Sequence, residues 1–365
     1  MVSLRNLSFC SVLGPKSPTR CNDVNAPRTL LVAADGGAVD ALAPLAPLLG
    51  STLEDVRSDE TADLGYWVGR IDATLAELVV VGTSDSIRGR RIESAARRAA
   101  RMRRLPLAAI EDFPGNYYDV CEGEVDLVLA ESPPARERLL ARPNAQALRV
   151  EVASPARYDV YRAHLQELRA TTRERWTLAS KTHAGPAVLW AGQPETDDAL
   201  ATLHALLPAL VSLGAELRFK AHPRDAGYAT GRYRDLLNAP DVEDVTRLPT
   251  STALAAAPAL VVTQFSSLAI EAGFYGIPAL FVLLPEAGGA RLLKKKGYAV
   301  PPLCEAGAGA LACTAAALAG ALATMLGDED YRARVLRCFD AYFEVAKISA
   351  PEVSEKLVRL VRESK

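Results

Sequence analysis

The chain has 365 residues, of which 49% are hydrophobic and 24% charged, and a formal net charge of −2. This length exceeds what one hydrophobic core usually supports, so we expect two domains in a globular enzyme. The nearly balanced charge gives no overall attraction to nucleic acid or to an anionic membrane.

The N-terminal segment, the apolar runs and the cysteines bear on the compartment. Residues 1–27 contain Arg5 and three prolines but no apolar core of signal-peptide length, so we expect a flexible leader. The longest apolar stretch, residues 253–262, is far shorter than a membrane span. The six cysteines show neither CxxC nor Cys/His spacing, which argues against a zinc site or a dense disulfide framework. We therefore expect a cytoplasmic protein without a transmembrane segment.

In the first half, short apolar runs alternate with helical patterns. Residues 29–34 (TLLVAA) are followed by Asp35, Gly36 and Gly37 and then by an Ala/Leu helical pattern, which is typical of the opening of a βαβ unit. Further runs follow at residues 78–81, 107–110, 127–130 and 148–152. Strands that alternate with helices predict a mostly parallel sheet covered on both faces, here a Rossmann-like domain over residues 28–157.

Arginines cluster in the helix expected after the second of these strands. We interpret most of the run as the solvated face of that helix, with an anionic partner as the alternative. The run comprises Arg88, Arg90, Arg91, Arg97, Arg98, Arg101, Arg103 and Arg104.

The second half repeats the same rhythm after a break. A charged helical stretch and a turn at residues 158–186 are predicted to link the domains. A second Rossmann-like domain is predicted over residues 187–327, followed by a helical segment over 328–365. Its expected strands are residues 187–191, 216–221, 260–263 and 279–283.

Polar residues and glycines follow many of the expected strands. In open parallel sheets, ligands bind outside the carboxyl ends of the strands, where the strand order reverses. These strand ends are therefore the candidate site. In the first half they carry Asp35, Gly36, Gly37, Ser84, Asp85, Glu111 and Asp112, and in the second half Gly192, Gln193, His222, Arg224, Gln264, Ser266 and Ser267.

The stretch after residues 260–263 is the most informative of these ends. Ser266 or Ser267 is placed to cap a short helix, whose first N–H groups and positive dipole end would then bind phosphate. Glu271, farther along that helix, suits hydrogen bonds to ribose hydroxyls. The alternatives are that the serines are only a helix cap and that Glu271 is an exposed helical residue.

His222 ends another strand and is followed by Pro223, which cannot continue ladder pairing. An imidazole at this position is able to donate to a phosphate or to contact a base. A lone histidine is more often structural, but Lys220, Arg224 and Asp225 beside it favour a ligand site.

These residues carry a resemblance to a known group of enzymes. Residues 219–223 (FKAHP), and residues 263–272 (TQFSSLAIEA) with the Gly-Ile-Pro at 276–278, resemble motifs of the nucleotide-binding domain of GT-B glycosyltransferases and UDP-N-acetylglucosamine 2-epimerases. The resemblance implies that His222 contacts the nucleotide, Ser266 and Ser267 the phosphate, and Glu271 the ribose.

The resemblance also implies a fold. A GT-B protein has two Rossmann-like domains with mostly parallel sheets that face a central cleft, and a C-terminal helix that returns to the first domain. We expect residues 328–365 to pack back on the first domain. The residues expected in that contact are Phe339, Tyr342, Phe343, Leu357, Leu360 and Val361.

The first half resembles the epimerases less closely. Residues 82–85 (GTSD) and 111–115 (EDFPG) are similar to their Gly-Asp-Thr and Glu-Ala-Gly elements, with shifts. Where the epimerases carry a catalytic histidine after the first strand of the second domain, this chain has Gln193, which cannot exchange a proton near neutral pH. Residues 285–289 (PEAGG) also depart from the epimerase pattern. Epimerase activity is therefore disfavoured.

The function predicted from these observations is metal-independent transfer of a sugar from a UDP- or CMP-type donor to an acceptor hydroxyl. The helix start at Ser266 and Ser267 and His222 would stabilise the leaving phosphate, with help from Arg224 or Lys220. Asp112 and Glu111 are the leading candidates for the base, because crowded carboxylates can have one pKa raised. Asp85 and Asp35 are their rivals, and the alternative is that the acidic pair only forms a turn.

Two other functions remain open at this point. One is a nucleotide-sugar 2-epimerase or hydrolase, and the other is a non-catalytic nucleotide-binding subunit. We expect no cofactor and no metal, since the nucleotide sugar is the substrate. The expected partners are that donor and a glycan or small-molecule acceptor, without nucleic acid, and a homodimer is left open.

Overall fold

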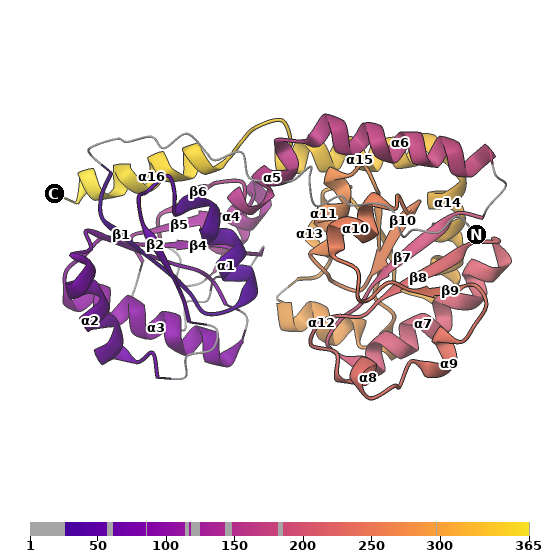
Figure 1. Ribbon diagram of the computed structural model, residues 1–365, viewed down its shortest axis with the longest axis horizontal. Coiled ribbons are helices and arrows are strands. Elements are labelled where there is room, and N and C mark those ends of the chain that lie inside the picture. The colour runs from indigo at the N-terminus through magenta and orange to yellow at the C-terminus, as the bar shows by residue number, and fades with distance from the viewer. Residues whose placement is uncertain are drawn as a thin grey trace. The chain divides into compact units, whose positions relative to one another are not determined.

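A computed structural model of the chain describes residues 26–56, 61–84, 86–113, 117, 125–142, 148–181, 185–296 and 298–364. The chain divides into two compact units, which can be followed in Figure 1 by the colour that runs with residue number. Unit 1 consists of residues 1–160 and 347–365, and unit 2 of residues 161–346. Within the described residues, no helix is long and apolar enough to span a membrane.

Unit 1 is built on a parallel sheet of six strands in the order β2-β1-β3-β4-β5-β6. Four of its strands, including β1 and β3, are buried along their whole length, as expected for a sheet covered on both faces. β2 is partly exposed and polar (TLED), so no apolar run marks it in the sequence. The strands are β1 (Thr29–Ala33), β2 (Thr52–Asp55), β3 (Leu78–Val81), β4 (Leu107–Ile110), β5 (Leu127–Ala130) and β6 (Val150–Val152).

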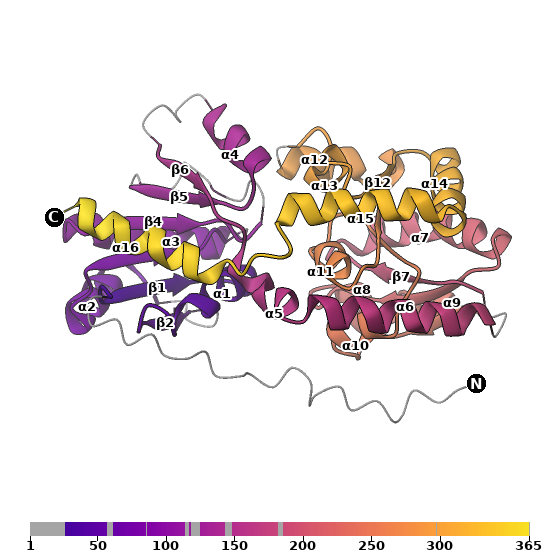
Figure 2. The ribbon, with the colours of Figure 1, turned by 90° about the horizontal axis from the view of Figure 1, so that it is seen from above.

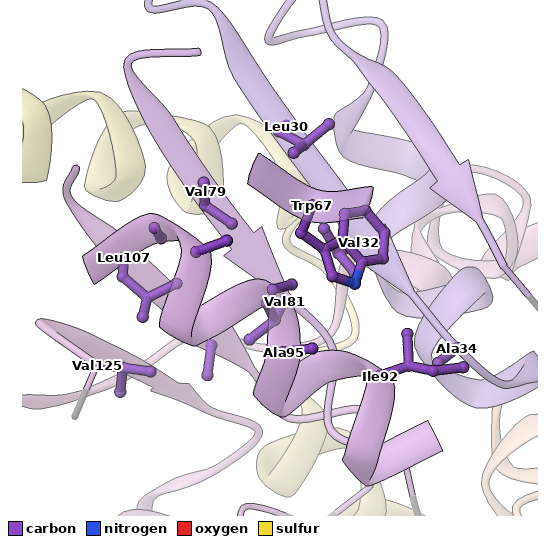
Figure 3. Packing of buried hydrophobic residues seen from close by; sticks show 14 of the residues in the cluster. Leu30, Val32, Ala34, Trp67, Val79, Val81, Ile92, Ala95, Leu107 and Val125 are labelled. Atoms are coloured by element: carbon purple, nitrogen blue, oxygen red, sulfur yellow. The ribbon is translucent and has the colours of Figure 1, made fainter. Parts of the chain in front are cut away.

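Helices cover both faces of this sheet. One face packs against α2 (Leu64–Thr74), α3 (Ile87–Met102) and α4 (Pro133–Leu140). Figure 3 shows side chains of α2 and α3, among them Trp67 and Ile92, meeting strand side chains such as Val32. The opposite face packs against α1 (Gly36–Leu42), two 3-10 turns, η3 (Ala43–Leu45) and η5 (Ala156–Tyr158), and α16 (Ala350–Glu363).

The return of the C-terminal helix to the first domain is confirmed by α16. Leu357, Leu360 and Val361 lie in the core of unit 1 with strand residues of its sheet. The Asp159 carboxylate, at the start of α5 (Asp159–Arg162), accepts the backbone N–H groups of Ser349 and Ala350 at 2.9 and 2.7 Å. This carboxylate therefore caps α16, although Asp159 and α16 are far apart in the sequence.

One residue of the arginine run departs from the expected solvated face. Arg97 is only 2% exposed, and its guanidinium lies 5.2 Å from the centre of the Tyr117 ring. Arg91 and Arg98 are exposed as predicted. The sequence alone does not show which side of the helix faces the sheet. Arg97 lies on that buried side.

Unit 2 contains a second parallel sheet of six strands, in the order β12-β11-β10-β7-β8-β9. The chain runs from β7 outward to β9 on one side and then from β10 outward to β12 on the other. The strand order therefore reverses between β7 and β10, which is where open parallel sheets bind ligands. The strands are β7 (Ala187–Ala191), β8 (Glu216–Lys220), β9 (Val242–Asp244), β10 (Leu260–Thr263), β11 (Ala279–Val282) and β12 (Ala310–Ala312).

The faces of this sheet are also covered. α7 (Thr196–Ser212) and α14 (Ala315–Gly327) pack on one face, and α6 (Leu165–Lys181), α10 (Thr250–Ala255) and α11 (Leu268–Phe274) on the other. The stretch predicted as a linker helix thus contributes α6 to the core of unit 2. The remaining helices are α8 (Ala226–Ala229), α9 (Arg234–Leu237), α12 (Gly289–Lys296), α13 (Pro302–Glu305) and α15 (Glu329–Phe343), and η6 (Pro285–Ala287) is a 3-10 turn.

The expectation that Phe339 and Phe343 pack on the first domain is wrong, because α15 belongs to unit 2. α11 lies between α6 and α15 (Figure 2), and Phe339 meets Phe274 edge-on at 5.3 Å between ring centres. A Cβ added at Gly273 would lie 2.3 Å from the Phe339 ring, so only glycine permits this approach. Tyr342 packs edge-on against Phe343. The C-terminal segment is therefore shared, with α15 in one unit and α16 in the other.

Both units together form the predicted fold class. Each has a six-stranded parallel sheet with helices on both faces, and in each the strand order reverses once. In unit 1 the reversal lies between β1 and β3.

Candidate functional site

In unit 2, the loops predicted to bind the nucleotide come from three neighbouring strands. Thr263 pairs with Ala191, and Ala191 pairs with Lys220, so β10, β7 and β8 end at the same level. A Cβ added at Gly192 would lie 2.9 Å from the backbone nitrogen of His222. Backbone therefore passes backbone here with no room for a side chain.

The imidazole of His222 has a defined protonation state. Its Nδ1 accepts the backbone N–H of Arg224 at 3.0 Å, so Nδ1 carries no proton. Burial, together with the charge of Arg224, lowers the pKa of His222. The ring is thus neutral near pH 7, with its proton on Nε2, and it is a hydrogen-bond donor through that atom.

Asp225 fixes the loop that carries His222. Its Oδ1 accepts the Thr196 hydroxyl at 2.5 Å and the Gly227 N–H at 2.9 Å, and its Oδ2 accepts the Tyr233 hydroxyl at 2.6 Å. The side chain is 5% exposed. Asp225 therefore holds the loop and does not itself face a ligand.

A threonine hydroxyl connects the loops after β7 and β10. Thr263 Oγ1 donates to the Ala191 carbonyl at 2.8 Å and accepts the Ser266 N–H at 3.2 Å. It also accepts Gln193 Nε2 at 3.4 Å. Gln193 is 7% exposed, so the structure places it inside the loop junction.

Of the two predicted capping serines, Ser266 makes the hydrogen bond. Its Oγ accepts the N–H of Leu268, the first residue of α11, at 3.3 Å. Ser267 occupies the N-cap position with helical backbone angles and makes no side-chain capping bond. Both serines are partly exposed. Phosphate binding at this helix start stays a prediction.

Glu271 is held by a residue that the sequence analysis did not single out. The Tyr161 hydroxyl donates to Glu271 Oε2 at 2.6 Å, and the Tyr161 ring stacks on Phe274 with 5.6 Å between ring centres. Tyr161 lies in the stretch interpreted as a linker, and nothing in its neighbourhood signalled a contact with α11. The carboxylate is therefore oriented before any ligand binds.

Two other predicted residues, Gln264 and Lys220, have hydrogen-bond partners that turn them away from a ligand. A third, Arg224, lies in solvent. Gln264 is 1% exposed and donates to the Ala287 carbonyl at 2.9 Å, so it joins two loops. Lys220 donates to the Leu248 carbonyl at 2.5 Å, and burial lowers its pKa. Arg224 is exposed.

In unit 1, Asp112 is placed by two residues near the point where the strand order reverses. Its Oδ1 accepts the Thr83 hydroxyl at 2.7 Å, and its N–H donates to Thr83 Oγ1 at 3.1 Å. A Cβ added at Gly37 would lie 2.2 Å from Asp112 Oδ2. Gly37 and Asp112 are thus brought together, whereas a Cβ at Gly36 would meet no atom within 4 Å.

Glu111 has a different environment from its neighbour. It is 1% exposed, and burial raises its pKa to about 8, so it is protonated at pH 7. Its Oε1 accepts the Tyr117 N–H at 3.3 Å. Asp112 contributes only a minor part of this shift, so desolvation rather than carboxylate crowding is the main cause.

The rival carboxylates stand as follows. Asp35 caps α1 by accepting the Ala38 N–H at 3.2 Å. Asp85 lies outside the described residues, as do residues 114–116 of the predicted turn.

Two buried glutamates of unit 1 and one partly buried arginine were missed. Glu93 of α3 accepts the N–H and the hydroxyl of Ser84 at 2.9 and 2.7 Å, and burial raises its pKa to about 8. Glu131 follows β5 and is 2% exposed. Burial lowers the pKa of Arg157, but Tyr158, Glu131 and Asp112 raise it by more, so the net pKa is raised. Glu131 obeys the strand-end rule and could have been found with it, whereas Glu93 sits inside a helix.

Metal ligands and free thiols bear on the chemistry open to the described part of the chain. No group of three or more His, Cys, Asp or Glu residues there is arranged to hold a metal ion. Cys304, Cys313 and Cys338 are free thiols, and the other three cysteines lie outside the described residues.

Comparison with known proteins defines the fold. No protein-family model matches the chain, and no curated protein sequence matches it. The S. aureus MnaA structure with UDP is similar with a TM-score of 0.61 and 14% identity, covering 92% of this chain and 96% of that one. A glycosyltransferase from Rickettsia africae has a TM-score of 0.61 and 12% identity, with 93% and 98% covered.

A third similar structure is the UDP-GlcNAc 2-epimerase from Neisseria meningitidis bound to UDP-GlcNAc, with a TM-score of 0.53, 13% identity, and 92% and 99% covered. Similarity at this level of identity shows the architecture and not the activity. The chain therefore has the two-domain GT-B fold that nucleotide-sugar epimerases and glycosyltransferases share, as predicted.

Proposed function

We propose that the chain transfers a sugar from a nucleotide-activated donor of the UDP or CMP type to an acceptor hydroxyl. The observation that carries the proposal is the neutral His222, whose Nδ1 is occupied by the Arg224 N–H and whose Nε2–H is left as a donor. It lies in the loop after β8, the strand next to β7, and the strand order of unit 2 reverses between β7 and β10.

In this proposal, unit 2 binds the donor. His222 Nε2–H and the hydroxyls of Ser266 and Ser267 donate to phosphate oxygens, and these bonds strengthen as negative charge develops on the leaving group. Glu271 accepts ribose hydroxyls, with its carboxylate held by Tyr161. Because His222, Ser266 and Glu271 are held by hydrogen bonds within the protein, little reorganisation is needed during the reaction.

Unit 1 supplies the proposed base. Asp112 is held by the Thr83 hydroxyl at 2.7 Å and would take the proton of the acceptor hydroxyl. The neighbouring Glu111 is unsuited to this role at pH 7, because burial raises its pKa to about 8 and keeps it protonated.

A second candidate function, epimerisation or hydrolysis of the nucleotide sugar itself, is favoured by the acid form of Glu111. Epimerisation needs an acid as well as a base, and Glu111 and Asp112 would supply both. Against it stands Gln193, which occupies the position of the histidine that the epimerases carry and cannot exchange a proton.

Incubation with a panel of nucleotide sugars, with and without candidate acceptors, followed by mass spectrometry, separates these functions. Transfer predicts an acceptor that gains one sugar, whereas epimerisation or hydrolysis predicts a changed donor in the absence of acceptor. Unchanged donor in every mixture, together with nucleotide binding, would indicate a non-catalytic subunit.

The donor site itself is tested by H222A, with H204A as the control. His204 is an exposed histidine on α7, so its removal makes the same chemical change away from the site. H222A should weaken UDP or CMP binding by roughly 10- to 150-fold, since a hydrogen bond to a charged group contributes about 1.5–3 kcal/mol. Equal nucleotide affinity of H222A and H204A would contradict the assignment of His222.

A further inference from the structure

The solvent-facing side of α3 in unit 1 carries an unusual set of side chains. Ile87 and Met102 are 88% and 60% exposed, and Arg91 and Arg98 between them are exposed as well. At 3.6 residues per turn, these four positions fall within a sector of about 60° on the helix and span about 22 Å. They therefore form one continuous stripe, which we call the α3 ridge.

The helix that carries the ridge is strongly basic. Its 16 residues include six arginines and one acidic residue, Glu93, whose side chain is buried against Ser84. Arg101 is compensated by Asp126 at 2.9 Å. Arg91 has no ion pair among the described residues. The composition of α3 is therefore basic on a chain whose net charge is −2.

The ridge is not required to hold α3 in the fold. The opposite side of the helix packs on the sheet through small residues, among them Ala96 and Ala99, which are at most 1% exposed. Gly89 approaches Ser84 so closely that an added Cβ would lie 2.5 Å from the serine Cβ. Core packing thus accounts for one side of α3 and leaves the exposed isoleucine and methionine without a structural role.

We propose that the α3 ridge docks on an anionic lipid surface. The guanidinium groups of Arg91 and Arg98 would contact headgroup phosphates, while Ile87 and Met102 would enter the interface between headgroups and acyl chains. The charge complementarity selects an anionic partner, and the two aliphatic side chains favour lipid over nucleic acid, which binds to cationic and stacking aromatic side chains. The proposal is independent of the reaction that the two units perform.

The test is co-sedimentation of the full chain with vesicles of phosphatidylcholine, with or without phosphatidylserine. Binding should require phosphatidylserine and weaken as salt is added, because the attraction is screened. R91E/R98E should lower the vesicle affinity at least about 25-fold, since one arginine near an anionic surface contributes roughly fivefold. I87S/M102S should also weaken binding, through the apolar half of the ridge.

Two control pairs make the same changes elsewhere. R334E/R337E reverses two exposed arginines of α15, and L178S/V211S removes two apolar side chains that are 63% and 61% exposed in unit 2. Both should sediment as the unaltered chain does. The unfolding midpoint of each variant, measured in parallel, shows whether it is folded.

Four outcomes would overturn the proposal. The first two are absence of sedimentation with phosphatidylserine vesicles and equal binding to both vesicle types. The third is a folded ridge variant of either kind that binds like its control. The fourth is tighter binding to single-stranded RNA than to vesicles at the same phosphate concentration. The last result would assign the ridge to nucleic acid.

Discussion

Gly37→Ala is expected to displace the Asp112 carboxylate, because that carboxylate occupies the space of a side chain at residue 37. The added Cβ would lie 2.2 Å from Asp112 Oδ2, whereas ordinary van der Waals contact begins at 3.4 Å. One of the two groups must therefore move by about 1 Å. Asp112 also accepts the Thr83 hydroxyl at 2.7 Å, so a movement of this size breaks that hydrogen bond.

The expected cost in unfolding free energy is about 1–3 kcal/mol, as for other overpacked interiors. Gly36→Ala is the matched control, since its Cβ would meet no atom within 4 Å and neither glycine has a positive φ. Both substitutions are in the first turn of α1, where alanine should otherwise gain up to about 1 kcal/mol over glycine. The difference between the two variants thus isolates the contact with Asp112.

Urea unfolding of both variants at pH 7 measures this difference, and G37A/D112A completes a double-mutant cycle. If the clash is with the carboxylate, G37A should lower the unfolding free energy much less in the D112A background than in the unaltered chain. Where a transferase or epimerase activity is found, G37A should lower it by about 100-fold, because a shift of 1 Å in a reacting group has that effect. Equal stability of G37A and G36A would refute the placement of Asp112 against α1.

Two further predictions concern carboxyl groups that accept hydrogen bonds. Tyr161→Phe removes the hydroxyl that donates to Glu271 at 2.6 Å, so the unfolding free energy should fall by about 1.5–3 kcal/mol. Nucleotide affinity, measured by calorimetry, should fall with it. Unchanged affinity would show that Glu271 is oriented without Tyr161. Burial raises the pKa of Glu93 to about 8, so the folded state holds a proton that the unfolded state releases above its ordinary value near 4.5. Stability should therefore decrease from about pH 5 to pH 8, by up to about 1.4 kcal/mol per pH unit for this group. Glu93→Gln should reduce that slope in denaturation measured across the same range, and an unaltered slope would mean that Glu93 is ionised in the folded protein.

The sequence predicted the central strands well, because a parallel sheet covered on both faces needs continuous apolar runs. β3, β4, β5, β7 and β10 have the expected bounds. The edge strands β2 and β9 were not predicted, since their side chains are partly exposed and their sequences, TLED and VED, carry polar residues. Periodicity detects burial, which β2 and β9 largely lack.

The candidate site was predicted where it depends on strand ends and missed where it depends on contacts distant in sequence. His222, Ser266 and Asp112 follow strands directly, so the fold class itself brought them to the candidate list. Tyr161 and Glu271 are 110 positions apart, and no local pattern connects them. The state of Glu111 was missed for a related reason, because its pKa follows from burial by several elements and not from the adjacent aspartate.

The two candidate functions require different proton transfers, and Glu111 is the residue of unit 1 whose role differs between them. Transfer to a hydroxyl needs one base, so a protonated Glu111 would serve only to accept the Tyr117 N–H. Epimerisation would require Glu111 to exchange its proton with the sugar, and its raised pKa of about 8 suits an acid near neutral pH. In unit 2 the equivalent demand is not met, since Gln193 is an amide that bonds Thr263 and does not titrate. A transferase is thus consistent with both units as they stand, whereas an epimerase would have to take both its acid and its base from unit 1.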